Sequence, residues 1–235
     1  MTSQVLHFGS EKIEFKVGYS SRKSLGISVN PDLSVDVRAP HGASMLKIHE
    51  KVKKRAPWII KQRARFERYP QKRPERRYVS GESFYYLGRQ YRLKVITAAE
   101  TKATLSRGVF TVHIVDKDAR GAVRKVVEKW LRERAANYFQ RRLETLVLKL
   151  KYHGVQLPIL QLKTMPKRWG SCTKGGKITL NPNLVKAPSH CIDYVIMHEL
   201  CHLIFHNHGP NYWKLLSKMM PDWRQRKERL ELIDP

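Results

Sequence analysis

The chain has 235 residues, of which 41% are hydrophobic, enough to form a sizeable core and too many for a wholly disordered chain. Forty-six Lys and Arg against 20 Asp and Glu give a formal net charge of +26, so a polyanionic partner has to be considered. No apolar run approaches the ~20 residues needed to span a bilayer, the N-terminus lacks the pattern of a signal peptide, and the three cysteines form no CxxC pair. We therefore expect a cytoplasmic protein without membrane segments or disulfides.

Short strands are predicted over the first third of the chain. Apolar and polar residues alternate there within segments that are separated by Gly, Pro, Asn or Ser. The alternating segments are 13–17, 25–29 and 33–37. Their pattern predicts a β-meander. A helical pattern follows Ser44 and is expected to break at Pro57. Residues 47–77 carry 13 basic and 3 acidic side chains, and the prolines within 69–74 predict that this stretch ends as an exposed linker.

Further elements are predicted in the rest of the chain from turns, alternation and helical spacing. They are a hairpin over 83–96 with its turn at Gly88, a strand over 109–115, a proline-free amphipathic helix over 119–150, strands over 160–164 and 177–181, and a helix after Ser189. This mixture indicates the α+β class. We expect a β-rich region with a basic helix or linker over 1–118, followed by a mainly helical region over 119–235.

The strongest chemical signal is an H-E-x-x-H motif in an apolar helical setting, His198-Glu199-Leu200-Cys201-His202. Residues four apart on a helix project from one face, so His198 and His202 can both present a ring nitrogen to one metal ion. Glu199 is rotated by about 100° from His198, which places it near the water on such an ion without making it a ligand. The motif therefore predicts a catalytic metal site.

A third ligand is expected shortly after this helix. His208 follows His202 by six residues and lies next to Gly209-Pro210, where the helix is predicted to end. The chain can turn there and bring a third imidazole back towards the first two. Three neutral imidazoles and one water form an open, four-coordinate zinc site of the catalytic kind. His206 is an alternative third ligand, because it lies four residues after His202 on the same helical face. Three rings along one straight face do not easily surround one ion. Glu228 is a more distant, acidic alternative.

Several segments together resemble one family. They are Arg168-Trp169-Gly170-Ser171-Cys172, Lys177-Ile178-Thr179-Leu180-Asn181, the H-E-x-x-H segment and Asn207-His208-x-x-x-Trp213, with further matches over 31–40, 58–59 and 87–93. In these segments the chain resembles the YgjP-like metallopeptidases, which are related to the SprT and WLM types. The resemblance implies a zincin-like helical catalytic region with a small antiparallel sheet. It also implies a Zn²⁺-dependent hydrolase with Glu199 as general base, and the ligands that it implies are His198, His202 and His208.

The loop before the predicted helix that carries H-E-x-x-H, called the metal helix from here on, contains candidates for contact with substrate. Arg168 either orients the substrate or the developing oxyanion, or braces the loop through backbone carbonyls. Trp169 and Ser171 are candidates for the same two roles, and Cys172 is either an inhibitory metal ligand or a small buried residue. The strand over 177–181 is expected at a sheet edge, where it either pairs with an extended peptide or is protected by its lysine.

Four residues are candidates for supporting the metal site. Tyr212 and Trp213 follow the third histidine at a spacing typical of core residues on a short helix. Asp193 lies near the start of the metal helix, where a carboxylate interacts favourably with the helix dipole. Asp222 is a candidate to orient a ligand ring by a hydrogen bond.

Two classes of function follow from these observations. The first is a zinc metallopeptidase that acts on protein or peptide substrates. The second is a basic nucleic-acid-binding protein with a structural or degenerate zinc site, and a protease that acts on nucleic-acid-bound proteins would combine the two. Residues 1–165 carry a net charge of +21 and residues 166–235 only +5. Most of the net charge therefore lies in one part of the chain and the metal-binding motif in the other. A regular interleaving of aromatic and basic residues, typical of proteins that bind single strands, is not evident, so we favour the peptidase.

Overall fold

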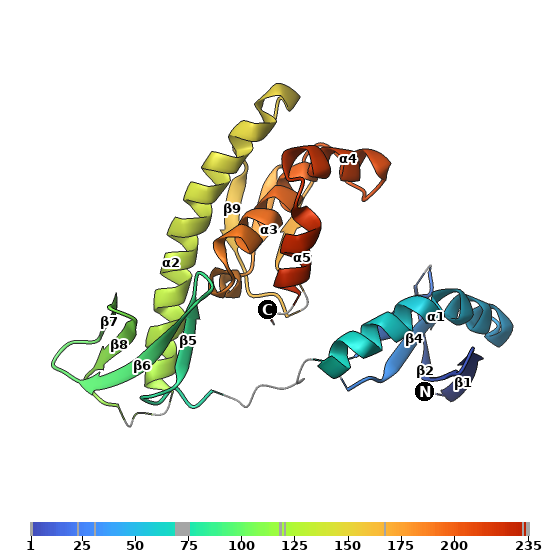
Figure 1. Cartoon of the computed structure of the whole chain (residues 1–235), viewed down its shortest axis with the longest axis horizontal. Helices are drawn as coiled ribbons and strands as arrows, with labels where there is room; N and C mark the ends of the chain where they lie inside the picture. Colours follow the sequence, from blue (N-terminus) through green and yellow to red (C-terminus); the bar gives the residue numbers. More distant parts are fainter. Residues whose placement is uncertain are drawn as a thin grey trace. The chain divides into compact units, whose positions relative to one another are not determined.

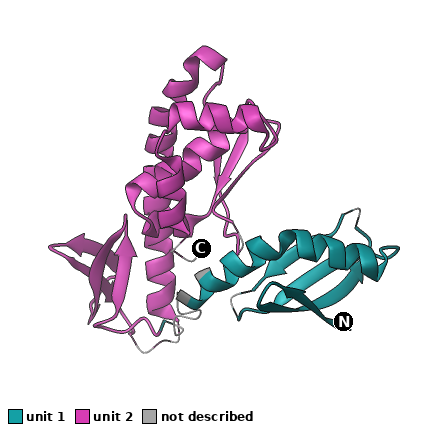
Figure 2. Ribbon diagram, turned by 45° about the vertical axis from the view of Figure 1, so that its right-hand side comes forward, with its two compact units in different colours: residues 1–76 teal, residues 77–235 magenta. Residues whose placement is uncertain are grey.

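The computed structural model of the chain divides into two compact units, Met1–Arg76 and Arg77–Pro235 (Figure 2). It describes residues 2–22, 24–30, 32–68, 76–117, 119, 121–166, 168–231 and 233. The division falls well before the predicted boundary between residues 118 and 119. The strands after residue 76 belong to the second unit.

The first unit is a four-stranded sheet covered by one helix (Figure 1). Its elements are β1 (Thr2–Phe8), β2 (Glu11–Ser20), β3 (Gly26–Val29), β4 (Val35–Pro40) and α1 (Met45–Arg68). The strand order is β1-β2-β4-β3, and β2 pairs with β4 in parallel. The predicted meander is therefore wrong, because β3 lies at the outer edge beyond β4 and not between its neighbours in the sequence. Alternation identifies strands but does not specify which of them pair.

Helix α1 continues through Pro57 without the predicted break. Proline removes one backbone donor, so the helix loses one hydrogen bond there. Its apolar stripe is buried against the sheet on both sides of the proline, at Ile48, Val52, Ala56 and Ile59, and this burial holds the helix together. The predicted basic helix is present and extends to Arg68, whereas the prolines within 69–74, on which the expected linker rests, lie outside the described residues.

The second unit begins with a four-stranded sheet that packs on a long helix. These elements are β5 (Ser83–Tyr86), β6 (Arg89–Thr97), β7 (Lys102–Ser106), β8 (Val109–Ile114) and α2 (Ala122–Val147). The predicted hairpin, the strand near 109–115 and the long helix are all present, and β7 was not predicted. Trp130 of α2 packs against Phe84 and Phe110 of the sheet, with ring centroids 6.1 and 4.7 Å away. This aromatic contact joins residues 83–114 to the helical region, so the chain divides near residue 76.

A smaller sheet and three helices complete the second unit (Figure 1). They are β9 (Ile159–Leu162), β10 (Gly170–Cys172), β11 (Lys177–Leu180), α3 (Ser189–Cys201), α4 (Pro210–Met219) and α5 (Trp223–Leu230). The predicted α+β class is confirmed. β11 pairs with β10 antiparallel and with β9 in parallel, so the sheet is mixed. The prediction of 177–181 as an edge strand is wrong, because β11 is paired on both sides and the two edges are formed by β10 and β9. Within the described ranges, no helix combines the length and apolar character needed to cross a membrane.

The tip of the β5–β6 hairpin is fastened to the segment that leads into α3. The backbone N–H groups of Leu87 and Gly88 donate to the carbonyls of Val185 and Lys186, at 2.8 and 3.1 Å. Gly88 has a φ of 77°, in the left-handed region that favours glycine. A Cβ at this position would lie 2.7 Å from the Cα of Pro188, the residue before α3. The hairpin therefore braces the start of that helix.

This contact predicts a difference between two glycines with the same backbone strain. Gly108 has a φ of 80° and open space around its Cβ position, so Gly108→Ala should cost about 1–2 kcal/mol from the left-handed conformation alone. Gly88→Ala should cost clearly more, because it adds the collision with Pro188. Thermal unfolding of the two variants beside the unchanged protein measures the difference. Equal losses would show that the hairpin tip does not stabilise this region.

Candidate metal centre

Helix α3 is the buried centre of the second unit and carries the H-E-x-x-H motif. Side chains around its whole circumference are buried, as expected for a helix enclosed by protein on all sides. Pro188 immediately precedes its first turn. It ends at Cys201, and the backbone N–H of Phe205 still donates to the Cys201 carbonyl at 3.0 Å in the following turns. The chain then reverses into α4, which begins at Pro210.

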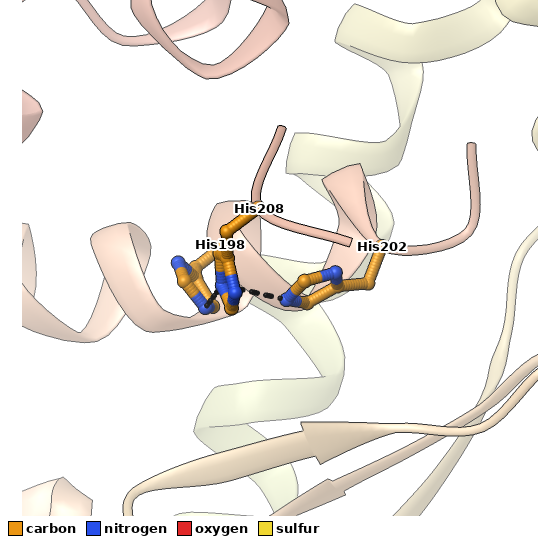
Figure 3. A group of neighbouring side chains, drawn as sticks. All are labelled: His198, His202 and His208. Carbon is orange, nitrogen blue, oxygen red and sulfur yellow. Dashed lines mark hydrogen bonds between the residues drawn. The ribbon is translucent and has the colours of Figure 1, made fainter. Parts of the chain in front are cut away.

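Three imidazole nitrogens converge at the end of this helix (Figure 3). The Nε2 atom of His208 lies 3.1 Å from Nε2 of His202 and 3.2 Å from Nε2 of His198. Zn²⁺ binds histidine nitrogen at about 2.0–2.1 Å, and two ligands of a tetrahedral ion are then about 3.3 Å apart. The observed separations match that value closely. The group therefore has the spacing and the donor chemistry to hold one metal ion.

Hydrogen bonds at Nδ1 orient the rings of His198 and His202 so that their Nε2 atoms face the shared point. The Tyr212 hydroxyl lies 3.1 Å from the His198 carbonyl, to which it donates, and 2.7 Å from His198 Nδ1. Because the single hydroxyl proton is donated to the carbonyl, the hydroxyl oxygen accepts a hydrogen bond from Nδ1–H of His198. Nδ1 of His202 lies 3.1 Å from the carbonyl of Phe205, which only accepts. Both rings therefore carry their proton on Nδ1 and present the Nε2 lone pair to the shared point.

Burial favours the uncharged form of two of the three histidines, His198 and His208. The pKa of His198 is lowered to about 3, first by burial and then by the neighbouring imidazoles of His202 and His208. Burial likewise lowers the pKa of His208. Metal binding requires the neutral imidazole, so this environment favours the ligand form at neutral pH.

Two aromatic residues of α4 hold the ligands in place. Tyr212 is fully buried and bonds to His198, as described. The indole N–H of Trp213 donates to the His208 carbonyl at 2.9 Å, and its ring stacks on the His208 ring at 5.4 Å. Trp213 stacks in turn on Trp223 at 4.9 Å. Sequence reasoning gave these residues only a core role, although their position one turn after His208 was the available signal of contact with it.

The rival residues lie outside the ligand group. His206 is exposed, and its Nδ1 lies 2.9 Å from the His202 carbonyl. Glu228 is exposed on α5 and, among the described residues, does not belong to the group of potential ligands. Asp222 pairs with Arg226 at 2.9 Å, and the ring partner expected from it is supplied by Tyr212 instead.

Asp193 joins two helices. Its two carboxylate oxygens accept from Nε and Nη2 of Arg142 on α2, at 2.7 and 2.8 Å. A bidentate pair of this kind is strong and directional. Asp193 therefore fastens the metal helix to α2, a role that the helix-dipole interpretation did not include.

Glu199 is buried beside the histidines and lies against strand β10. Only 5% of its surface is exposed. Burial raises its pKa to about 7, and the charge of Arg168 acts in the opposite direction. A Cβ at Gly170 would lie 2.6 Å from Oε1 of Glu199, so the strand approaches the carboxylate through a residue that has no side chain. The carboxylate is therefore held between the metal helix and the sheet edge.

The loop and strand before β11 carry the remaining candidates. Arg168 is exposed and near enough to Glu199 to lower its pKa. Trp169 and Ser171 are half-buried, and the Trp169 carbonyl accepts from the Asn181 N–H at 2.8 Å. The Asn181 side chain also donates to the carbonyls of Met165, at 2.8 Å, and Arg168. Asn181 thus braces the loop, whereas the sequence suggested only that it ends a strand.

Cys172 is a protonated, half-buried residue at the end of β10. Burial first, and the nearby Glu199 carboxylate second, raise the pKa of its thiol to about 11. The thiol donates to the Thr173 carbonyl at 3.4 Å. It does not belong to the group of potential metal ligands among the described residues. These observations favour the small, half-buried residue over the inhibitory ligand.

Comparison with known proteins agrees with this geometry. The family model described as YgjP-like, metallopeptidase domain, matches residues 23–232. The chain therefore belongs to the YgjP-like family and is a metallopeptidase, which implies a metal ion. Among solved structures, the crystal structure of the metallopeptidase zymogen of Pyrococcus abyssi abylysin is 21% identical, covers 39% of this chain and 90% of its own, and has a TM-score of 0.36, too low to bear on the site. A comparison with curated proteins found no match.

The arrangement predicts different effects for two neighbouring histidines. His208→Ala removes one of three converging nitrogens and should lower bound zinc well below one ion per chain, whereas His206→Ala removes none of them and should leave it unchanged. Elemental analysis of the purified variants, after dialysis against the same zinc buffer, measures the difference. Equal zinc content in both would remove His208 from the site.

Proposed function

We propose that this protein is a zinc-dependent peptidase in which three histidines bind the ion and Glu199 is the general base. The proposed ligands are His198, His202 and His208. The observation that carries the proposal is the convergence of the three Nε2 atoms beside a buried carboxylate. Three imidazoles leave a fourth position for water, the arrangement of catalytic zinc. Membership of a metallopeptidase family supports peptide hydrolysis as the reaction.

The residues around the ion have separate tasks. When bound, zinc would acidify a water and polarise the scissile carbonyl. Glu199 accepts the proton of the attacking water and returns it to the leaving amine. Its pKa near 7, raised by burial, lets the same group take and release a proton at neutral pH. The cation of Arg168 favours the ionised carboxylate and is available to orient the substrate.

Strand β10 is proposed to position the substrate. The Trp169 carbonyl and the Thr173 N–H bond to β11, so alternation along an antiparallel strand directs the main-chain groups of Gly170 and Cys172 away from β11. An extended peptide can add to this edge as a further strand. Because Gly170 lies against Glu199, the added strand would run past the general base. Strand addition was one of the two interpretations given to residues 177–181, but that strand is central.

The general-base role predicts the effect of a nearly isosteric change. Glu199→Gln should retain zinc and lose at least about 10²-fold in hydrolysis of a fluorescent casein, because the amide cannot accept the proton. Glu228→Gln, the same change on an exposed glutamate of α5, should leave both properties unaltered. Elemental analysis and a protease assay report on the two properties separately. Undiminished hydrolysis in Glu199→Gln would contradict the assignment.

The close approach of β10 makes a second prediction about the same carboxylate. Gly170→Ala should displace Glu199 and reduce hydrolysis strongly while zinc content stays close to normal, because the new Cβ would lie 2.6 Å from Oε1. Gly175→Ala is the matched control, since it lies in the turn between β10 and β11 with nothing within 4 Å of its Cβ position. Kinetic assays of both variants would contradict this prediction if their activities were equal.

A further inference from the structure

One groove of the first unit has no part in the peptide hydrolysis proposed above. It has a volume of about 690 Å³ and lies between the edge strand β3 and one flank of α1. Its lining combines apolar residues, one tryptophan and three cations, and consists of Leu25, Ile27, Lys51, Lys54, Arg55 and Trp58. All six residues belong to the first unit, so the groove is formed within it.

The helix presents its part of the lining from one flank. At 100° per residue, Trp58 projects between Lys51 and Lys54 when α1 is viewed along its axis, and Arg55 lies next to Lys51. Trp58 is 38% exposed, unusually high for this residue type. Lys51 and Arg55 are one turn apart, about 6 Å along the axis. The groove therefore has an aromatic face with positive charge on both sides.

The three cations of the groove are available for a ligand. Within the part of the chain that the structure describes, none of Lys51, Lys54 and Arg55 forms a salt bridge or a side-chain hydrogen bond. Arg63 on the same helix differs, because it donates to the carbonyls of Leu33, Lys12 and Glu14, at 3.1, 3.2 and 3.3 Å. Its charge is used to hold α1 on the sheet. The basic cluster of α1 thus contains a structural cation and a separate group facing the groove.

We propose that this groove binds single-stranded nucleic acid. A base stacks on Trp58 and contacts the apolar wall at Leu25 and Ile27, while successive phosphates contact Lys51, Lys54 and Arg55. Stacking on an aromatic face next to a positively charged track is the general way in which proteins bind single strands. The proposal is independent of the peptidase proposed above.

The lining favours a single strand over two other polyanions. In a duplex the base faces are covered by stacking, so Trp58 would contribute little and charge alone would act. An acidic peptide would satisfy the cations, but it has no regularly spaced planar group for the exposed indole. The net charge of +26 on the whole chain is consistent with a polyanionic partner of either kind.

Binding of labelled oligonucleotides to the full-length protein tests the proposal. Fluorescence anisotropy with a 12-mer of deoxythymidine, the matching uridine 12-mer and a 12-bp duplex gives the affinities at several salt concentrations. We expect the single strands to bind more tightly than the duplex, and Trp58→Ala to weaken them about tenfold or more. Trp58→Phe, which keeps an aromatic face, should lose much less and controls for folding.

Two adjacent lysines provide the matched control for charge. Lys54 lines the groove, whereas its neighbour Lys53 is exposed and does not. Lys54→Gln should weaken single-strand binding several-fold and make the slope of log affinity against log salt shallower by about 0.7, the value for one phosphate contact on a single strand. Lys53→Gln makes the same change of charge and should alter affinity less than twofold.

Three results would overturn the proposal. The first is an equal effect of the two lysine variants, which would show that only the overall charge matters. The second is unchanged single-strand affinity in Trp58→Ala. The third is equal competition by a poly-glutamate peptide of the same charge, which would assign the groove to acidic peptides. Unchanged zinc content in all variants would show that the metal centre is intact whichever result is obtained.

Discussion

The metal centre depends on hydrogen bonds that decide which nitrogen of each imidazole carries a proton. Tyr212 and the Phe205 carbonyl hold that proton on Nδ1 of His198 and His202, so the two Nε2 lone pairs face the same point. Both partners come from the segment after α3, where the chain turns back across the end of the helix. That reversal also brings His208 to the other two rings. Ligand position and ring orientation therefore have one structural cause.

The same enclosure that orders the histidines also sets the chemistry of Glu199. Helix α3 is surrounded by protein, so its carboxylate is removed from water and its pKa rises to about 7. The strand beside it approaches closely only because Gly170 has no side chain. Arg168, exposed at the start of this strand, partly offsets the burial. The proposed general base and the proposed peptide-binding edge are thus parts of one arrangement.

Both units carry an excess of positive charge, with 17 basic and 7 acidic residues over 1–76 and 29 basic and 13 acidic residues over 77–235. In α1, Lys51, Lys54 and Arg55 line the groove, whereas Arg63 holds the helix on the sheet. In the second unit Arg142 and Arg226 pair with carboxylates, and Arg168 lies beside the proposed general base. Under the two proposals, a nucleic-acid-binding unit tethered to a catalytic one would raise the local concentration of any substrate attached to the bound strand. The groove and the metal centre would together suit proteins carried on nucleic acid.

The sequence by itself determined the features that depend on local spacing. The H-E-x-x-H motif, the third histidine six residues later, the long helix after residue 119 and the α+β class all follow from patterns within a few turns of chain. Only the tertiary structure decided which strands pair, and it made β11 central, with β10 and β9 at the two edges. It also supplied Tyr212 as a ring partner, Gly170 as the space for Glu199, and the groove between β3 and Trp58. Each of these depends on contacts between segments far apart in the chain, and periodicity, which reports only the local direction of side chains, does not contain them.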